Sequence, residues 1–280
     1  GVSPTTVSRV LNQKMLVRKE TEERVWAAVE TLGYRPNASA RALSTRQTSS
    51  IGIVVRDICD PFFPPIVHGV TYVANANGYS SFLCNLSTEP DTAFYLQLVR
   101  EKRVDGIIIA TSHIPDEQVL LVLNEGAPLV LVNREMDGVV SVCTDNEQGG
   151  WDATRHLIDL GHRNIAYIGV PSYVQSGIPR RIGYERALRE HTIPLNPNLL
   201  FEEENSADGG YRAAMDLLSS REKVSAVFVY DDVMAIGAIR ALEEMGLRVP
   251  NDMSVVGYDD IPLASHITPP LTTVRQAKDV

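Results

Sequence analysis

Three polar side chains near the start of the chain recur at a helical spacing. Thr5, Arg9 and Asn12 fall at i, i+4 and i+7, which places them on one face of a helix. A hydroxyl, a guanidinium and an amide in one row can donate hydrogen bonds to base edges and phosphates in a DNA major groove. The alternative is an ordinary solvated face, and this helix alone favours the alternative.

The elements that would position this face are two short helices. Ser3 and Pro4 suit the start of the first helix, because serine caps a helix and proline fits its first turn. The second helix is predicted at 21–32, where Gly33 ends it. The apolar side chains expected on the buried sides of the two helices are Val7, Val10 and Leu11, and then Val25, Ala28, Val29 and Leu32.

Charge is distributed unevenly along the 280 residues. The net charge is −9, yet residues 1–46 carry eight Lys and Arg against four Glu, a net +4, which leaves −13 for the rest. A basic head on an acidic body indicates that the head meets a polyanion while the body does something else.

The stretch after Gly33 permits two interpretations. Pro36 breaks the chain, Asn37 can cap a helix, and the alanine-rich residues that follow can form about two helical turns, which are marginal in water. One interpretation is a flexible linker. The other is a hinge helix that orders only on DNA and inserts Leu43 into the minor groove as an apolar wedge.

Beyond residue 50 the sequence alternates between strands and helices. Strands are predicted at 51–55, 80–84, 106–110, 128–132, 165–170, 226–230 and 254–258. Helices are predicted at 64–77, 90–102, 116–125, 149–160, 180–190, 209–219 and 232–245. Several of these helices are followed by glycine, the expected C-terminal stop. The alternation predicts an α/β fold with parallel sheets covered by helices on both faces, in two lobes that divide near 143–150.

Carboxylates, an amide, an arginine and aromatic rings follow the predicted strands, where ligands of open α/β sheets bind. These residues are Arg56, Asp57, Asp60, Phe62, Phe63, Thr144, Asp145, Asn146, Asp231, Asp232, Asp259 and Asp260. Acidic groups accept hydrogen bonds from sugar hydroxyls and rings stack on sugars, so the set predicts a site for a polyhydroxylated, partly apolar ligand. The alternative role of each aspartate is a helix cap, and that of each phenylalanine is a place in the core.

Short motifs occur in both the head and the body. Those of the head are GVSPTTVSRVLN (1–12) and GYRPNA (33–38), and those of the body are DPFF (60–63), VDG (104–106), TDN (144–146), LGHRNI (160–165), DVMAIGA (232–238), SVVGYDDIP (254–262) and PPLTTV (269–274). Together the motifs resemble the lactose-repressor (LacI/GalR) family of transcription regulators along the whole chain. The resemblance implies a partial helix-turn-helix head and a hinge helix, followed by two Rossmann-like parallel-sheet lobes of periplasmic-binding-protein type.

The same resemblance implies roles for particular residues. The implied DNA contacts are Ser3, Pro4, Thr5, Thr6, Ser8, Arg9 and Asn12, with Asn37, Ala40 and Leu43 in the minor groove. The implied effector contacts are Phe62, Phe63, Asp145, Arg180, Asp231 and Asp259. Arg181 lies beside Arg180 and competes for its role.

Three positions depart from the family pattern. Asp231 stands where many relatives have asparagine, Asn205 where some have an aromatic platform, and Arg18 where a serine cap is usual. The implied domains are a partial helix-turn-helix (1–34), a hinge and linker (35–50), two lobes (51–145 and 146–274) and the start of a return crossing (275–280). The resemblance also implies that both ends of this sequence are truncated, so uncovered apolar surface should reduce solubility.

Signals of other functions are absent from the sequence. It contains no Gly-x-Gly-x-x-Gly, Walker-A, His-Glu-x-x-His or Gly-x-Ser-x-Gly motif, and its six histidines lack ligand spacing, so we expect no enzyme, cofactor or metal. No apolar run approaches the roughly 20 residues of a membrane span. Three cysteines without a paired framework indicate a reducing cytoplasm.

The sequence therefore predicts a DNA-binding transcriptional regulator, a repressor that acts as a homodimer on operator DNA. A small metabolite between the lobes, with a sugar as the first candidate, would control operator affinity. Two rival classes stay open. A sugar-binding receptor of the periplasm would need no basic head, and an enzyme such as a dehydrogenase would bind nucleotides.

Overall fold

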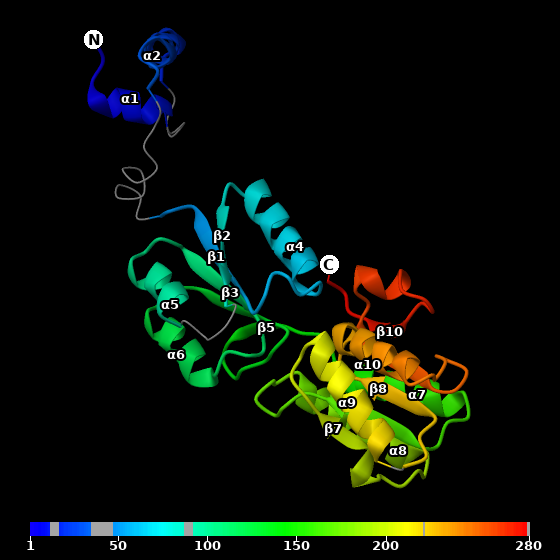
Figure 1. Ribbon diagram of the computed structural model, residues 1–280. Helices are drawn as coiled ribbons and strands as arrows, with labels where there is room; N and C mark the ends of the chain where they lie inside the picture. Colours follow the sequence, from blue (N-terminus) through cyan, green and yellow to red (C-terminus); the bar gives the residue numbers. More distant parts are fainter. Residues whose placement is uncertain (12–16, 35–46, 87–91, 221, 279–280) are drawn as a thin grey trace.

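A computed structural model of the chain describes residues 1–11, 17–34, 47–86, 92–220 and 222–278. Two helices form the head, α1 (Pro4–Leu11) and α2 (Lys19–Thr31), shown in blue in Figure 1. The Ser3 hydroxyl accepts from the backbone N–H of Thr6 (3.1 Å), which confirms the predicted cap. Arg18 precedes α2 without a side-chain cap.

The apolar side of α2 is only partly as predicted. Val10 of α1 and Val25 of α2 are buried, whereas Ala28 is exposed and Leu32 is 79% exposed. The prediction that Ala28 and Leu32 are buried is wrong for the described residues. Among the described elements, α1 is the one that packs on α2. Because α1 has only about two turns, it covers the surface of α2 around Val25 and leaves Ala28 and Leu32 uncovered.

The first lobe contains a five-stranded parallel sheet in the order β2-β1-β3-β4-β5. Its strands are β1 (Ser50–Val55), β2 (Ser80–Asn85), β3 (Gly106–Ala110), β4 (Leu129–Val132) and β5 (Val140–Val142). Its helices are α4 (Phe63–Ala76), α5 (Thr92–Arg100) and α6 (Asp116–Asn124). Alternate residues of β1 face opposite sides: Ile53 packs with Phe63 and Ile66 of α4, and Val54 packs with the cluster of α5 and α6.

The second lobe repeats this winding in the order β10-β9-β8-β6-β7. Its strands are β6 (Ile165–Gly169), β7 (Leu200–Glu202), β8 (Ala226–Val229), β9 (Ser254–Asp259) and β10 (Thr272–Arg275). Its helices are α7 (Asn146–Asp159), α8 (Gly177–Glu190), α9 (Ala207–Ser219) and α10 (Asp232–Glu244). Tyr167 of β6 faces the cluster of α7 and α8, and the next residue, Ile168, faces that of α9 and α10. Both sheets are therefore covered on two faces, as the alternation predicted.

The predicted strands and helices of the body are all present, with small shifts at their ends. Gly78 and Gly246 follow α4 and α10 with φ angles of +77° and +80°, which glycine adopts without strain. The short strands β5, β7 and β10 were not predicted. In the described part of the chain, no helix combines the length and apolarity needed to cross a membrane.

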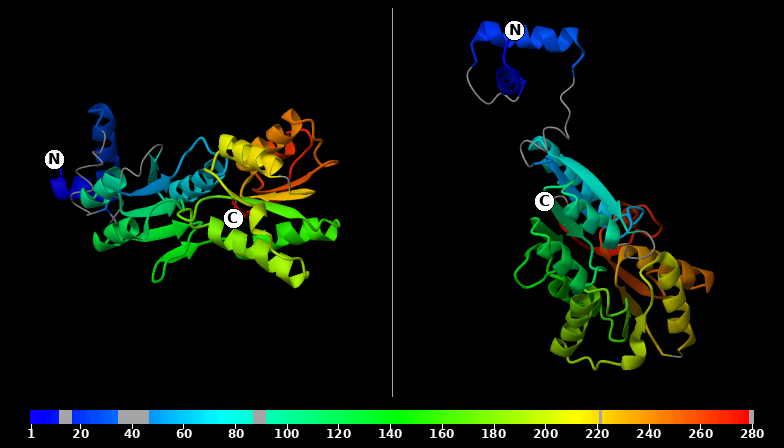
Figure 2. Two further views of the ribbon diagram at one scale, coloured as in Figure 1. Left: turned by 60° about the horizontal axis from the view of Figure 1, so that its bottom comes forward. Right: turned by 90° about the vertical axis from the view of Figure 1, so that its left-hand side faces the viewer.

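The order of strands reverses at the same place in each sheet. In the first lobe this point lies between β1 and β3, and in the second between β6 and β8. Ligands of such sheets bind outside the carboxyl ends of the strands at this point. Figure 2 shows the two lobes side by side, and after β10 the chain returns to the first lobe, where the Lys278 Nζ atom lies 5.8 Å from the ring centre of Phe62.

Candidate functional site

A small cavity of about 20 Å³ lies between the lobes, with room for about one water molecule. The first lobe contributes Arg56, Asp60, Phe62, Phe63, Ser112, His113 and Asn133, and the second contributes Arg180, Asn205, Tyr230, Asp231 and Asp259. Asn133 also borders a larger cavity of about 500 Å³, which is lined by Arg134, Glu135, Cys143, Thr144, Asp145, Asn146, Glu147, Gln175, Ser176 and Pro179. The larger cavity has the size of a small-molecule site.

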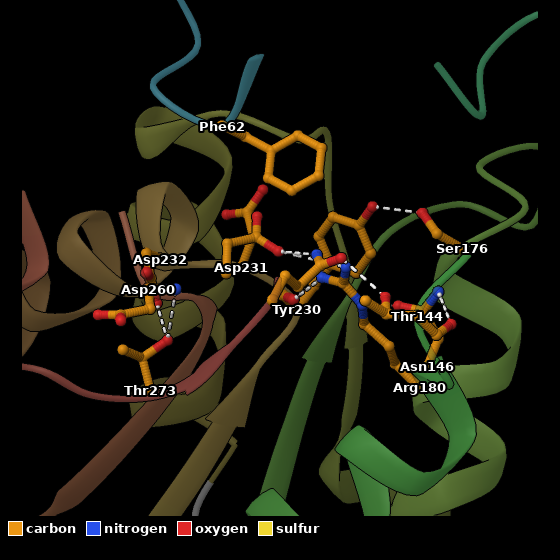
Figure 3. A network of polar contacts seen from close by, with 12 residues as sticks. Phe62, Thr144, Asn146, Ser176, Arg180, Tyr230, Asp231, Asp232, Asp260 and Thr273 are labelled. Carbon is orange, nitrogen blue, oxygen red and sulfur yellow. Dashed lines mark hydrogen bonds and ion pairs between the residues drawn. The ribbon is translucent and has the colours of Figure 1, made fainter. Parts of the chain in front are cut away.

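Arg180 of α8 is almost fully buried, and several neighbouring groups fix its side chain. Its guanidinium donates to Asn146 Oδ1 (2.9 Å), the Tyr230 carbonyl (2.6 Å) and Asp259 Oδ1 (3.3 Å), as Figure 3 shows in part. It also lies 3.6 Å from the ring centre of Tyr258. Arg181 instead pairs with Glu185 and Glu202, so the geometry places Arg180, and not Arg181, at the cavity.

Asp259 ends β9 in a left-handed conformation, with φ of +109°. Its Oδ1 accepts from Arg180 and from Gln276 Nε2 (2.5 Å). Burial raises the pKa of this carboxyl, and the nearby Arg180 guanidinium opposes that rise. The two donors and the fixed backbone orient the carboxylate rigidly toward the cavity.

Asp231 and Asp145 cap helices, as the alternative interpretation proposed. Asp231 Oδ1 accepts from the Met234 N–H (2.8 Å) and Asp145 Oδ1 from the Gln148 N–H (2.8 Å). Asp231 nevertheless lines the small cavity, and Asp145 the larger one. Burial, with the negative charges of Asp259 and Asp60, raises the pKa of Asp231. Asp231 and Asp145 therefore each cap a helix and also line a cavity.

Phe62 and Phe63 belong both to the core and to the cavity wall. They are 6% and 5% exposed and pack edge to face with ring centres 5.2 Å apart. Ile53 and Val55 of β1 support them from below. The structure thus brings five of the six predicted effector residues to the small cavity, with Asp145 at its neighbour.

Sequence reasoning named Arg56 among the polar residues of this cavity but missed His113 and Asn133. Buried atoms that lack a hydrogen-bond partner in the described chain include Arg56 Nε, His113 Nδ1, Asn133 Oδ1 and Asn205 Oδ1. Burial and the nearby Arg56 lower the pKa of His113 to about 4, so its ring is neutral. Since buried polar groups are normally paired, these four atoms are candidates to bind a ligand. His113 and Asn133 follow β3 and β4, so the strand-end rule could have found them.

Hydrogen bonds between described residues join the lobes around the cavity. Arg56 Nη1 donates to the Asn205 carbonyl (3.2 Å), and Gln175 Nε2 donates to Asp116 Oδ1 (3.1 Å). Ser112 and Ser176 share a bond between their hydroxyls (3.1 Å). The cavity is therefore closed by direct contact between the lobes, and a change in their spacing must break these bonds.

The head presents most of its predicted DNA-contacting residues to the surface. Ser3, Pro4, Thr5, Ser8 and Arg9 are exposed. Thr6 is half-buried, and its hydroxyl shares a hydrogen bond with that of Ser3 (2.9 Å). The predicted contacts that lie outside the described residues are Asn12, Asn37, Ala40 and Leu43, and the predicted hinge helix lies there as well.

A helical head with an exposed polar face and a two-lobed body with an enclosed polar site define the class of ligand-responsive DNA-binding regulators. Residues 1–37 match the family model of bacterial regulatory proteins of the lacI family. Residues 48–279 match that of periplasmic binding proteins and the sugar binding domain of the LacI family. The chain therefore belongs to the lacI family of bacterial regulatory proteins.

Individual relatives agree with this assignment. The chain is 39% identical over 281 residues to the HTH-type transcriptional repressor PurR of Haemophilus influenzae (strain PittEE), covering 99% of this chain and 84% of the relative. It is similar in structure to the lac repressor dimer bound to operator and the anti-inducer ONPF (TM-score 0.87, 32% identity, 100% of this chain and 85% of that one). It is also similar to the complex of the transcriptional regulator CelR with cellobiose (TM-score 0.77, 33% identity, 100% and 86%).

These findings confirm the predicted family, fold class and function as a transcriptional regulator. The relatives are repressors and not enzymes, and the matched head distinguishes the chain from a periplasmic receptor. The roles of single residues and the division into domains are not tested by these comparisons and stay predictions.

Proposed function

We propose that the chain is a repressor that reads operator DNA with α1 and responds to a small metabolite, a sugar first of all, bound between its lobes. The observation that carries the proposal is the cluster of unpaired buried polar atoms in the cavity between the lobes. A rearrangement of the lobes on binding would change the separation of two paired heads. A coupling of about 1–3 kcal/mol changes operator affinity about 5–150-fold.

The DNA surface is proposed to be the exposed face of α1 around Thr5 and Arg9, followed by the minor-groove contacts predicted beyond residue 35. Thr5 and Arg9 are both exposed, and the head is basic, so the charge favours DNA. The relation to the lac repressor solved on its operator supports this role. The proposed action on DNA favours a location in the cytoplasm.

The effector residues are proposed to be Phe62, Phe63, Arg180, Asp231 and Asp259, with Asp145 at the adjoining cavity. Two related regulators were solved with cellobiose and with ribose, which supports a sugar as the first ligand class to test. The contacts of Arg180 explain why this side chain can bind without moving.

We further propose that the regulator is a homodimer. Tyr72 and Val73 of α4 and Phe82 and Leu83 of β2 are exposed apolar side chains on the first lobe. An apolar patch of this kind is typical of a protein interface. A two-fold dimer would place its two heads on the half-sites of a pseudopalindromic operator.

The proposal is tested by selecting bound sequences from random double-stranded oligonucleotides and measuring affinity by fluorescence anisotropy. Affinity is then measured again with a panel of sugars and nucleosides. We expect one preferred, pseudopalindromic sequence and at least one metabolite that changes its affinity fivefold or more, about 1 kcal/mol. Equal affinity for all oligonucleotides, with and without metabolites, would refute the proposal.

A further inference from the structure

A third cavity, of about 300 Å³, lies in the second lobe beside α8 and β7 (Figure 1) and is called the α8 cavity below. Every residue that lines it belongs to the second lobe, so it is separate from the site between the lobes. Its volume lies at the lower end of the range of small-molecule sites. Nine residues line it, whereas one side of a protein interface takes about 20–30 residues. The cavity therefore fits a small molecule and not a partner protein.

The inner part of the α8 cavity is apolar. Tyr167 of β6 and Val170, which follows this strand, line it and are 2% and 6% exposed. Ile178 and Ile182 lie one turn apart on α8 and are 47% and 45% exposed. An apolar group in the cavity would cover the two isoleucine side chains, and the removal of apolar surface from water favours binding.

The charged residues that line the α8 cavity have a net negative charge. Arg181 Nε pairs with Glu185 Oε1 (2.9 Å), and Arg181 Nη1 pairs with Glu202 Oε1 (3.2 Å). These three residues are the charged groups of the lining, so one guanidinium serves two carboxylates. Among the described residues, the second oxygen of each carboxylate has no hydrogen-bond partner. The lining therefore attracts a cation, to which carboxylate oxygens bond strongly.

The other arginines of α8 do not remove this surplus. Arg180 and Arg186 pair with Asp259 and Glu147. Arg189 is exposed one turn beyond Glu185 and does not line the cavity. The two carboxylates of the lining thus share Arg181 as their cation.

We propose that the α8 cavity is a second ligand site, which binds a small molecule composed of a flat apolar group and one positive charge. The apolar group packs against Ile178 and Ile182, and the cation bonds to the free oxygens of Glu185 and Glu202. An anion is repelled by these carboxylates, and a neutral molecule gains only the apolar contact. Because the site uses neither the head nor the residues between the lobes, it is independent of the effector and of operator DNA.

The first test follows the isoleucine δ1 methyl groups of the full chain by NMR, with signals assigned from single Ile→Val variants. Three matched probes are titrated at neutral pH: tryptamine (a cation), tryptophol (neutral) and indole-3-propionate (an anion). We expect saturable shifts of the Ile178 and Ile182 signals. Tryptamine should bind about fivefold more tightly than tryptophol, the upper range for a partly exposed ion pair, and indole-3-propionate should bind most weakly.

The same spectra show where each probe binds. Ile53 and Ile66 lie beneath Phe63 at the cavity between the lobes, so their signals should not move. Shifts of these two signals in place of Ile178 and Ile182 would put the amine between the lobes and overturn the proposal. Equal affinities for the three probes would overturn it as well.

The second test removes the surplus charge. The double variant Glu185→Gln, Glu202→Gln should bind tryptamine no more tightly than tryptophol, whereas Glu243→Gln, at an exposed residue of α10, should keep the fivefold preference. Unchanged binding of tryptophol shows that the double variant is folded. A preference for tryptamine that persists in the double variant would exclude the two carboxylates and refute the inference.

Discussion

The Thr144 hydroxyl donates to Gln276 Oε1 over 2.8 Å, although the two residues are 132 positions apart. Thr144 lies where the chain first crosses between the lobes, and Gln276 where it crosses back. The Gln276 amide also donates to Asp259 Oδ1 (2.5 Å). The Gln276 side chain thus links both crossing segments to the Asp259 carboxylate of the candidate site. A movement of the lobes that displaces Gln276 therefore also disturbs Asp259.

Gln276→Ala is expected to weaken the coupling between effector and DNA. The change removes the bonds to Thr144 and Asp259 while leaving the DNA surface intact. The ratio of operator affinities with and without effector should fall by about 2–30-fold, the range of 0.5–2 kcal/mol for coupling mutations. The matched control is Gln97→Ala, which removes a surface bond to Glu101. An unchanged ratio would exclude Gln276 from the coupling.

Arg9→Ala should weaken binding to the selected operator far more than to random DNA. A contact to a base edge contributes about 1–3 kcal/mol to specificity, and Arg9 is exposed on α1. Anisotropy titrations on both DNAs measure the difference, with Arg24→Ala, an exposed residue of α2, as control. Equal losses on both DNAs would reassign Arg9 to a phosphate contact.

Asp259→Ala should destabilise the second lobe strongly. It leaves Arg180 buried without its carboxylate, and removal of one partner of a buried pair costs about 3–5 kcal/mol. Asp252→Ala removes a surface partner of Arg248 and should change the free energy of unfolding much less, because solvent screens exposed ion pairs. Urea denaturation compares the free energies of unfolding. Equal, small losses would mean that Arg180 finds water or another acceptor.

Two glycine substitutions should act in opposite directions. A Cβ at Gly237 would lie 1.8 Å from the Ala207 carbonyl oxygen, so Gly237→Ala must force α9 and α10 apart. A Cβ at Gly69 of α4 meets nothing within 4 Å, and Gly69→Ala should stabilise the chain by about 0.4–1 kcal/mol. The melting temperatures of the two variants and the wild type measure these changes: Gly237→Ala should melt below the wild type and Gly69→Ala above it. Similar melting temperatures for both variants would contradict the close packing of α9 on α10.

His113 should make stability depend on pH between about 4 and 6.5. Its folded pKa of about 4 lies below the ordinary histidine pKa of 6.5, so between these pH values the unfolded chain binds a proton that the folded chain excludes. Stability is fully present above pH 6.5 and falls as pH is lowered, by at most about 1.4 kcal/mol per pH unit. His113→Asn should reduce this fall relative to the wild type. Parallel pH profiles of the free energy of unfolding in the two proteins would show that His113 binds its proton equally well in the folded and the unfolded chain.

The candidate site was predictable wherever a charge or a ring follows a strong strand. Phe62 follows β1, and Asp259 lies at the carboxyl end of β9, so the strand-end rule identified them. His113 and Asn133 also follow strands, β3 and β4, but the sequence reasoning did not apply the strand-end rule there. Tyr230 was missed because the predicted strand 226–230 included it, whereas β8 ends at Val229. The short strands β5, β7 and β10 were missed because three or four residues give too little periodicity to detect.

The sequence by itself determined the family, the α/β architecture and the basic head, because these depend on local patterns: strand and helix periodicity, glycine stops, motif spacing and the position of charges. Only the tertiary structure decided which guanidinium meets which carboxylate. Arg180 and Arg181 are adjacent in sequence, yet the turn of α8 directs one into the cavity and the other to the surface. Asp231 shares a cavity with Arg56 and Asp60 of the other lobe only because the lobes pack together, and neighbours in sequence do not set such distances in space.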